Sequence, residues 1–114
     1  MKISTLSGGN SIMMLFLLII ISACSEKIPY HPRQYTVTLK EMQFKPVITT
    51  ASEGDTIIFI NHDIVVHNVT EAAHREWTSS NLPPGQSWKF IVKSSAEYYC
   101  TIHPVMKGTI VLKR

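Results

Sequence analysis

Short extended segments separated by turn residues fill most of the chain and constrain its fold more than any other feature. Alternating or β-rich segments are predicted at residues 35–39, 44–49, 56–60, 67–70, 88–93, 97–100 and 109–113. Turns are indicated between them, for example at Gly54-Asp55 and at Pro83-Pro84-Gly85. No segment has capped apolar residues at helical spacing, although residues 71–77 could form one helical turn. The pattern predicts an all-β protein, a small sandwich of seven to eight strands.

The amino-acid composition excludes several classes of function and of site. The chain has 114 residues, with 11 Lys and Arg against 8 Asp and Glu, and a formal net charge of +3. This mild excess is not gathered into basic runs, so we expect no nucleic-acid binding. The two cysteines, Cys24 and Cys100, are too few for a disulfide-rich scaffold or a four-cysteine zinc site.

The N-terminal segment has the layout of a secretory signal. Ten apolar residues at positions 12–21 follow the basic Lys2 and precede the small residues Ser22 and Ala23. The apolar run is shorter than the roughly 20 residues that a membrane-spanning helix needs. We therefore expect export of the protein, with an uncleaved anchor helix as the alternative.

The end of this segment, Ile21-Ser22-Ala23-Cys24, resembles the lipoprotein box of bacterial exported proteins. The resemblance implies a lipoprotein signal peptide at residues 1–23 and a lipid on the Cys24 sulfur. It also implies attachment to a bacterial membrane, at its periplasmic or cell-surface face. Residues 24–33 then form a tether and residues 34–114 the folded domain. A plain free cysteine at position 24 is the alternative.

Four residues with metal-binding side chains stand out in the predicted domain. Cys100, His103 and Met106 follow one another at three-residue steps, and His67 lies far upstream. Each has an ordinary structural explanation when taken alone. One thiolate, two imidazoles and a thioether together make a soft site that favours copper, whereas zinc gains little from a thioether. A metal would also stabilise a domain of this size, whose single cysteine cannot form an internal disulfide.

The segment at residues 97–108, EYYCTIHPVMKG, resembles the copper loop of the cupredoxins, the type 1 blue copper proteins, and its short His-x-x-Met spacing is most similar to that of amicyanin. The resemblance implies a Greek-key β-sandwich with one type 1 copper per chain. It implies that His67, Cys100 and His103 are equatorial ligands and that Met106 is the axial one. It also implies that Asn68 supports the site, with Thr101 as its hydrogen-bond partner. Family members often have proline where this chain has Ile102.

The resemblance implies a single-electron shuttle, and we expect no enzyme activity, because four protein ligands would leave no open position on the metal. The expected partners are larger redox proteins, such as a cytochrome, an oxidase or a dehydrogenase, that dock transiently on a monomer. The docking patch is expected around His103, with Pro104, Val105 and residues 64–66. A copper carrier or scavenger with the same ligands is the alternative, and a metal-free adhesion-type sandwich is a third. His31, His62 and His74 are expected to be exposed histidines without a metal.

Overall fold

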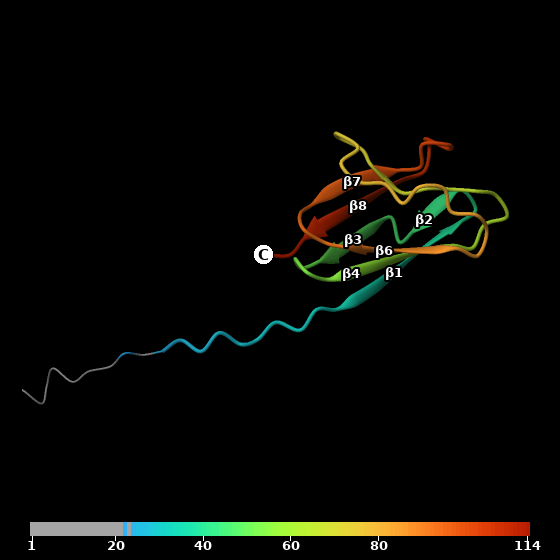
Figure 1. Cartoon of the computed structure of the whole chain (residues 1–114). Helices are drawn as coiled ribbons and strands as arrows, with labels where there is room; N and C mark the ends of the chain where they lie inside the picture. The colour runs from blue at the N-terminus through green and yellow to red at the C-terminus, as the bar shows by residue number, and fades with distance from the viewer. Residues whose placement is uncertain (1–21, 23) are drawn as a thin grey trace, which may run out of the picture.

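In the part of the chain that the structure describes, eight strands form the two sheets of a sandwich (Figure 1). The computed structural model describes Ser22 and residues 24–114, so the signal-peptide prediction falls almost wholly outside the described residues. The strands are β1 (Gln34–Lys40), β2 (Gln43–Lys45), β3 (Ile48–Ala51), β4 (Thr56–Asn61), β5 (Thr70–Glu71), β6 (Ser87–Ile91), β7 (Ala96–Tyr99) and β8 (Lys107–Leu112). One sheet has the order β2-β1-β4-β6 and the other β3-β8-β7-β5. The all-β prediction is confirmed.

Residues 71–77, for which the sequence allowed one helical turn, are not helical. They form the end of β5 and a tight turn. The Glu71 carboxylate accepts hydrogen bonds from the backbone N–H groups of Ala73, His74 and Glu76, which holds this turn closed. Within the described part of the chain, no helix is long and apolar enough to cross a membrane.

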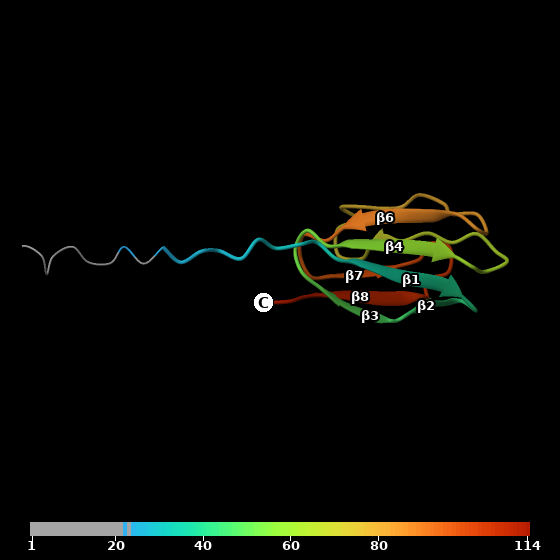
Figure 2. The same cartoon turned by 90° about the horizontal axis from the view of Figure 1, so that it is seen from below.

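Two strand pairs of the sandwich are parallel, and they show at which end of the sandwich each strand begins. β1 runs parallel to β4, and β3 runs parallel to β8, whereas the other pairs are antiparallel. β1 and β4 therefore both start at the end of the sandwich where residues 24–33 lead into β1, and the C-terminus lies at the same end (Figure 2). The segments that follow β1 and β4 begin at the opposite end.

The predicted extended segment at residues 44–49 is two strands in different sheets. β2 ends at Lys45 and pairs with β1, and β3 begins at Ile48 and pairs with β8. Pro46 lies between them, and it has no N–H with which to continue the β2 ladder. The chain crosses from one sheet to the other at this residue.

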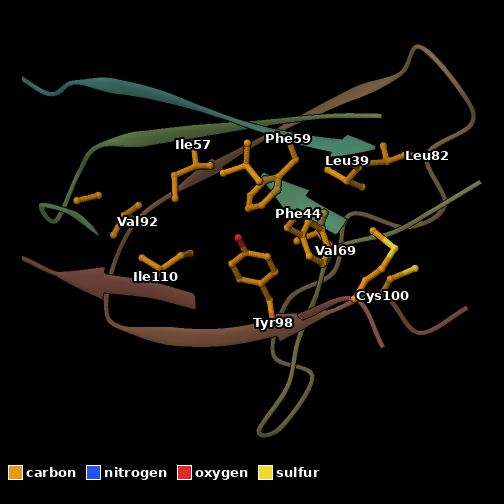
Figure 3. Packing of buried hydrophobic residues seen from close by; sticks show 13 residues of the cluster. Leu39, Phe44, Ile57, Phe59, Val69, Leu82, Val92, Tyr98, Cys100 and Ile110 are labelled. Atoms are coloured by element: carbon orange, nitrogen blue, oxygen red, sulfur yellow. The ribbon is translucent and has the colours of Figure 1, made fainter. Parts of the chain in front are cut away.

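Aromatic side chains from both sheets fill the middle of the core. The Tyr98 ring, from β7, contacts Phe44 of β2 and Phe59 of β4 edge-to-face, with centroids 4.9 and 5.3 Å apart. Such pairs contribute about 0.5–1.5 kcal/mol beyond the area that they bury. Figure 3 shows Val92 at one end of this core and Cys100 at the other. Cys100 is fully buried, so the core extends to the loop that bears the predicted metal ligands.

Candidate metal centre

The loop that joins β7 to β8 carries three of the four predicted ligands. Cys100 is the first residue after β7, and Met106 is the last before β8. The Cys100 N–H donates to the Met106 carbonyl at 3.1 Å, and the Met106 N–H donates to the His103 carbonyl at 3.0 Å. These hydrogen bonds close the loop and bring the three ligand residues together. Cys100 and Met106 are buried, whereas His103 is half-buried.

His67 reaches the site from the segment between β4 and β5. The predicted strand at residues 67–70 is shorter than expected, because only Thr70 and Glu71 form β5. His67 makes an isolated bridge with Leu82, with N–H···O distances of 3.2 and 2.7 Å in the two directions. This bridge fixes the His67 backbone, and its side chain is fully buried.

Three ligand atoms from the two segments form a small triangle. The Nδ1 atoms of His67 and His103 lie 3.1 Å apart, and each is 3.9 Å from the Cys100 Sγ. A point equidistant from the three atoms is about 2 Å from each, the length of a metal–nitrogen or metal–sulfur bond. His67, Cys100 and His103 also form the one cluster with metal-binding spacing among the described His, Cys, Asp and Glu residues.

Asn68 links the two segments that hold the triangle. Its backbone N–H lies 3.4 Å from the Cys100 Sγ, and its side-chain amide donates to the Thr101 Oγ1 at 2.7 Å. The Thr101 N–H donates in turn to the Asn68 Oδ1 at 3.0 Å. The sequence prediction placed Asn68 next to Thr101, and the structure brings these two residues together.

One acidic residue at the site was missed by the sequence analysis. The Asp63 Oδ2 lies 2.8 Å from the Nε2 of His67, on the side of the ring away from the triangle. Hydrogen bonds from His67 and from the backbone N–H of Met42 lower the pKa of Asp63 to about 2, so the carboxylate is charged at neutral pH. A carboxylate close before a metal-binding histidine was a usable signal. The loop conformation that brings the Asp63 carboxylate to the His67 ring could not be predicted from the spacing of the two residues in the sequence.

The surface beside the triangle is apolar. Ile64 and Val105 are 91% and 80% exposed, and Val65 and Ile102 are exposed to a smaller degree. Val66, which was expected in the same patch, is half-buried. The other three histidines, His31, His62 and His74, are exposed and lie outside the metal-binding cluster.

The donor set fits copper. Two imidazole nitrogens and one sulfur at near-equal spacing match the trigonal His₂Cys arrangement of blue copper sites, in which a methionine is the weak axial ligand. The buried Met106 closes the same loop. His67 and Cys100 are shielded from solvent, which suits a metal held by protein side chains alone.

Comparisons with known proteins agree with this geometry. A family model described as a cupredoxin-like domain matches residues 11–112. A purple cupredoxin from Nitrosopumilus maritimus has a similar fold, with a TM-score of 0.65 and 18% identity over 69% of this chain and 99% of that chain. A reduced amicyanin variant has a TM-score of 0.62 and 24% identity over 70% of this chain and 82% of that chain.

A third structure with a similar fold is the Cu-containing nitrite reductase from Thermus scotoductus SA-01. Its TM-score is 0.65 with 20% identity, over 82% of this chain but only 25% of that chain. No curated protein sequence matches the chain. The family model spans most of the chain, and the solved structures have the same fold. The chain therefore belongs to the cupredoxin family, and His67, Cys100, His103 and Met106 lie where they can form its copper site.

Proposed function

We propose that this cupredoxin is a one-electron carrier. The observation that carries the proposal is the arrangement of the His67, Cys100 and His103 donor atoms, which are already at binding distance from one common point. Copper held there would supply a reversible one-electron couple. A site of this geometry is acceptable to both oxidation states, so little rearrangement accompanies electron transfer.

The burial of the ligands suggests where electrons enter and leave. His67, Cys100 and Met106 are buried, and His103 is the one candidate ligand with partial exposure. The Cys100 sulfur is closed off from water and from small reactants. We propose that the His103 ring is the contact through which electrons reach a partner.

The apolar residues around His103 form the proposed docking face. Ile64 and Val65 belong to the segment before His67, and Ile102 and Val105 flank His103 on the ligand loop. The two segments meet where the His67 and His103 rings face each other. A small apolar face of this kind suits transient docking with larger redox proteins, such as a cytochrome, an oxidase or a dehydrogenase.

An enzyme role has less support. Four protein side chains would leave no open position on the metal, unlike a catalytic site. The likeness to a nitrite reductase shows that this fold also occurs within an enzyme, and this chain spans a quarter of that protein's length. We propose a carrier and not an enzyme. A copper carrier or scavenger with the same ligands is the competing function.

Electron self-exchange between copper(I) and copper(II) copies of the protein tests the docking face. Val105→Asp should slow the exchange at least tenfold, as measured by NMR line broadening. Ile91→Asp is the matched control, because Ile91 is 59% exposed and pairs with Thr56 at the tether end of the sandwich. Equal rates in the two variants would exclude the docking face. Rapid loss of copper to a competing chelator, with slow self-exchange in the unmodified protein, would favour the copper carrier.

We further propose that residues 1–23 are a lipoprotein signal, that Cys24 carries a lipid, and that residues 24–33 tether a monomeric domain of residues 34–114. The protein would then lie at the periplasmic or cell-surface face of a bacterial membrane. Cys24 is exposed and free, and β1 begins only at Gln34, which agrees with a tether. Cys24→Ala should move the protein from the membrane fraction to the soluble fraction or leave it unprocessed. Unchanged membrane attachment would contradict the proposal.

A further inference from the structure

Asp63 contacts one of the candidate metal ligands, the His67 ring. It lies in the segment between β4 and β5, and its side chain is only 13% exposed. Its Oδ2 faces the His67 Nε2 at 2.8 Å, and the same oxygen accepts the Met42 backbone N–H at 3.1 Å. Its other oxygen, Oδ1, accepts the Ile64 backbone N–H at 3.0 Å. The carboxylate is thus held by hydrogen bonds while it contacts the ring.

This contact selects one tautomer of His67. A charged carboxylate can only accept hydrogen bonds, so the proton on a neutral imidazole must be on Nε2. The lone pair is then on Nδ1, the atom that faces Cys100 and His103. Without the carboxylate the proton could also be on Nδ1, where it would block metal binding.

The carboxylate is itself fixed by elements far apart in the sequence. Met42 belongs to the two-residue turn between β1 and β2, where Glu41 and Met42 have φ angles of 54° and 60°. The Asn61 side chain accepts the Asp63 N–H at 2.9 Å and donates to the backbone oxygens of Val65 and Leu82. Leu82 bridges His67, so one network orients the carboxylate and the ring together.

The charge of Asp63 is not neutralised by a cation. Within residues 24–114, no Lys or Arg lies within ion-pair distance of the Asp63 carboxylate, and the one ring that it contacts is the imidazole of His67. The nearest lysine–carboxylate pair on this turn is Lys45 with Glu41, at 3.2 Å. The negative charge of Asp63 therefore acts on the His67 ring.

We propose that Asp63 is a positioning residue of the metal centre: its carboxylate holds His67 in the Nε2–H tautomer and, through that ring, favours Cu(II) over Cu(I). The inference rests on the proposed copper function and deepens it. Hydrogen-bonded carboxylates raise the basicity of metal-binding histidines, and their loss costs about 10–100-fold in metal affinity.

Two substitutions in the full-length chain separate the effect of the hydrogen bond on the His67 tautomer from the effect of the negative charge on the copper. Asp63→Asn keeps an oxygen that can accept the Nε2–H but removes the charge, and Asp63→Ala removes both. The matched control is Glu41→Gln, which removes a charge from the neighbouring turn without a contact to His67. All variants are compared by circular dichroism, reduction potential and copper affinity.

The metal-free protein provides a readout that does not depend on copper. Nitrogen-15 NMR of the histidines should show His67 as the Nε2–H tautomer in the unmodified protein and in Asp63→Asn. Asp63→Ala should show a mixture of tautomers. A single Nε2–H tautomer in folded Asp63→Ala would overturn the positioning role.

In the copper protein, Asp63→Asn and Asp63→Ala should weaken Cu(II) binding more than Cu(I) binding and raise the potential. A tenfold larger loss for Cu(II) corresponds to about 59 mV. An unchanged potential in both variants, or an equal rise in Glu41→Gln, would overturn the electrostatic role. If the unmodified protein binds no copper or is not reversibly reduced, the proposed function fails instead, and the NMR experiment still tests the tautomer.

Discussion

The two cysteines of the chain lie in opposite environments. Cys24 is exposed in the tether, whereas Cys100 is fully buried at the end of the core. A buried free cysteine usually packs as a small hydrophobic residue, but the Cys100 sulfur faces two imidazole rings and the N–H of Asn68. These neighbours are the groups that surround a metal-bound thiolate.

Replacing Cys100 by serine should therefore abolish the intense visible absorption of the copper protein, because that band needs a copper–thiolate bond. Cys24→Ala is the control, since it removes a thiol that lies outside the site, and it should leave the spectrum unchanged. Visible absorption spectroscopy of the two copper-loaded variants checks the prediction. A Cys100→Ser protein that stayed blue would remove Cys100 from the ligand set.

We expect Met106 to change the reduction potential of the copper and to contribute little to copper binding. An axial thioether is a weak ligand whose identity changes the reduction potential. Met106→Leu keeps an apolar side chain of similar volume at this buried position, so the variant should bind copper with a shifted potential. Voltammetry gives the comparison, with Ile110→Val as a buried control. A potential equal to that of the unmodified protein would mean that Met106 only fills space.

At the scale of elements, Asn68 joins two segments that the sequence separates by 33 residues. Its side chain is buried and bonded on both the amide and the carbonyl side, to Thr101 and to the Thr70 hydroxyl. Asn68→Ala should lower the free energy of unfolding of the metal-free protein by about 1–3 kcal/mol, because the buried Thr70 hydroxyl and the Thr101 N–H both lose a hydrogen-bond partner. Urea unfolding measures this. Gln86→Ala is the control at an exposed amide side chain that does not contact Asn68, and an equal loss there would contradict the prediction.

Close packing between β7 and β8 depends on a glycine. Gly108 pairs with Tyr98 across the two strands, and a Cβ added at Gly108 would overlap the Tyr98 ring. Gly108→Ala should cost about 1–3 kcal/mol of unfolding free energy, since an overpacked core must shift. Lys107→Ala, at the exposed neighbouring position, should cost much less. If Gly108→Ala lowers the unfolding free energy as little as Lys107→Ala does, the strand pair tolerates a side chain at position 108.

The hydroxyl group of Tyr98 predicts a stabilising substitution. The Tyr98 hydroxyl is buried and has no hydrogen-bond partner among the described residues, and burial raises its pKa. Tyr98→Phe removes this unpaired polar group and keeps the ring that contacts Phe44 and Phe59. The variant should be as stable as the unmodified protein or more stable by about 1 kcal/mol. A clear loss in urea unfolding would show that the hydroxyl contributes to stability.

At the scale of the whole molecule, the sandwich has two different ends. The segment before β1, the proposed tether, is held at one end, where the Asp55 carboxylate accepts hydrogen bonds from the Tyr30 hydroxyl, the Arg33 N–H and the Ser52 N–H. The candidate copper site lies at the other end, because Figure 3 shows Cys100 at the end of the core opposite Val92, whose N–H donates to the Asp55 carbonyl. A membrane anchor on the tether would leave the apolar face around His103 directed away from its attachment point.

Asp55 should make the tether end sensitive to acid. Burial by itself raises the pKa of Asp55, but the hydrogen bonds from Arg33, Tyr30 and Ser52 outweigh it, and the pKa lies below its ordinary value. A carboxyl group of this kind stabilises the fold above about pH 4, and the stabilisation is lost as the pH falls through the lowered pKa. Asp55→Asn should reduce this loss, as measured by urea unfolding between about pH 3 and pH 7. The same acid profile in both proteins would contradict the assignment.

The sequence alone determined the features that depend on neighbouring residues. The alternation of apolar and polar residues predicted an all-β fold, because a strand with one buried face must alternate. The three-residue steps from Cys100 to Met106 predicted a ligand loop, because a short loop can bring residues so closely spaced to one centre. His67 was a candidate by its side-chain chemistry, but its role as an equatorial ligand was implied only by the resemblance to cupredoxins, since nothing local connects it with that loop.

The tertiary structure alone decided how distant segments meet. It divided residues 44–49 between two sheets at Pro46, and it confined the strand expected at residues 67–70 to Thr70–Glu71. It also placed Asp63 against the His67 ring, through contacts with the β1–β2 turn. Strand pairing and loop docking depend on which surfaces the whole chain can bury together, and that information is not carried by local spacing.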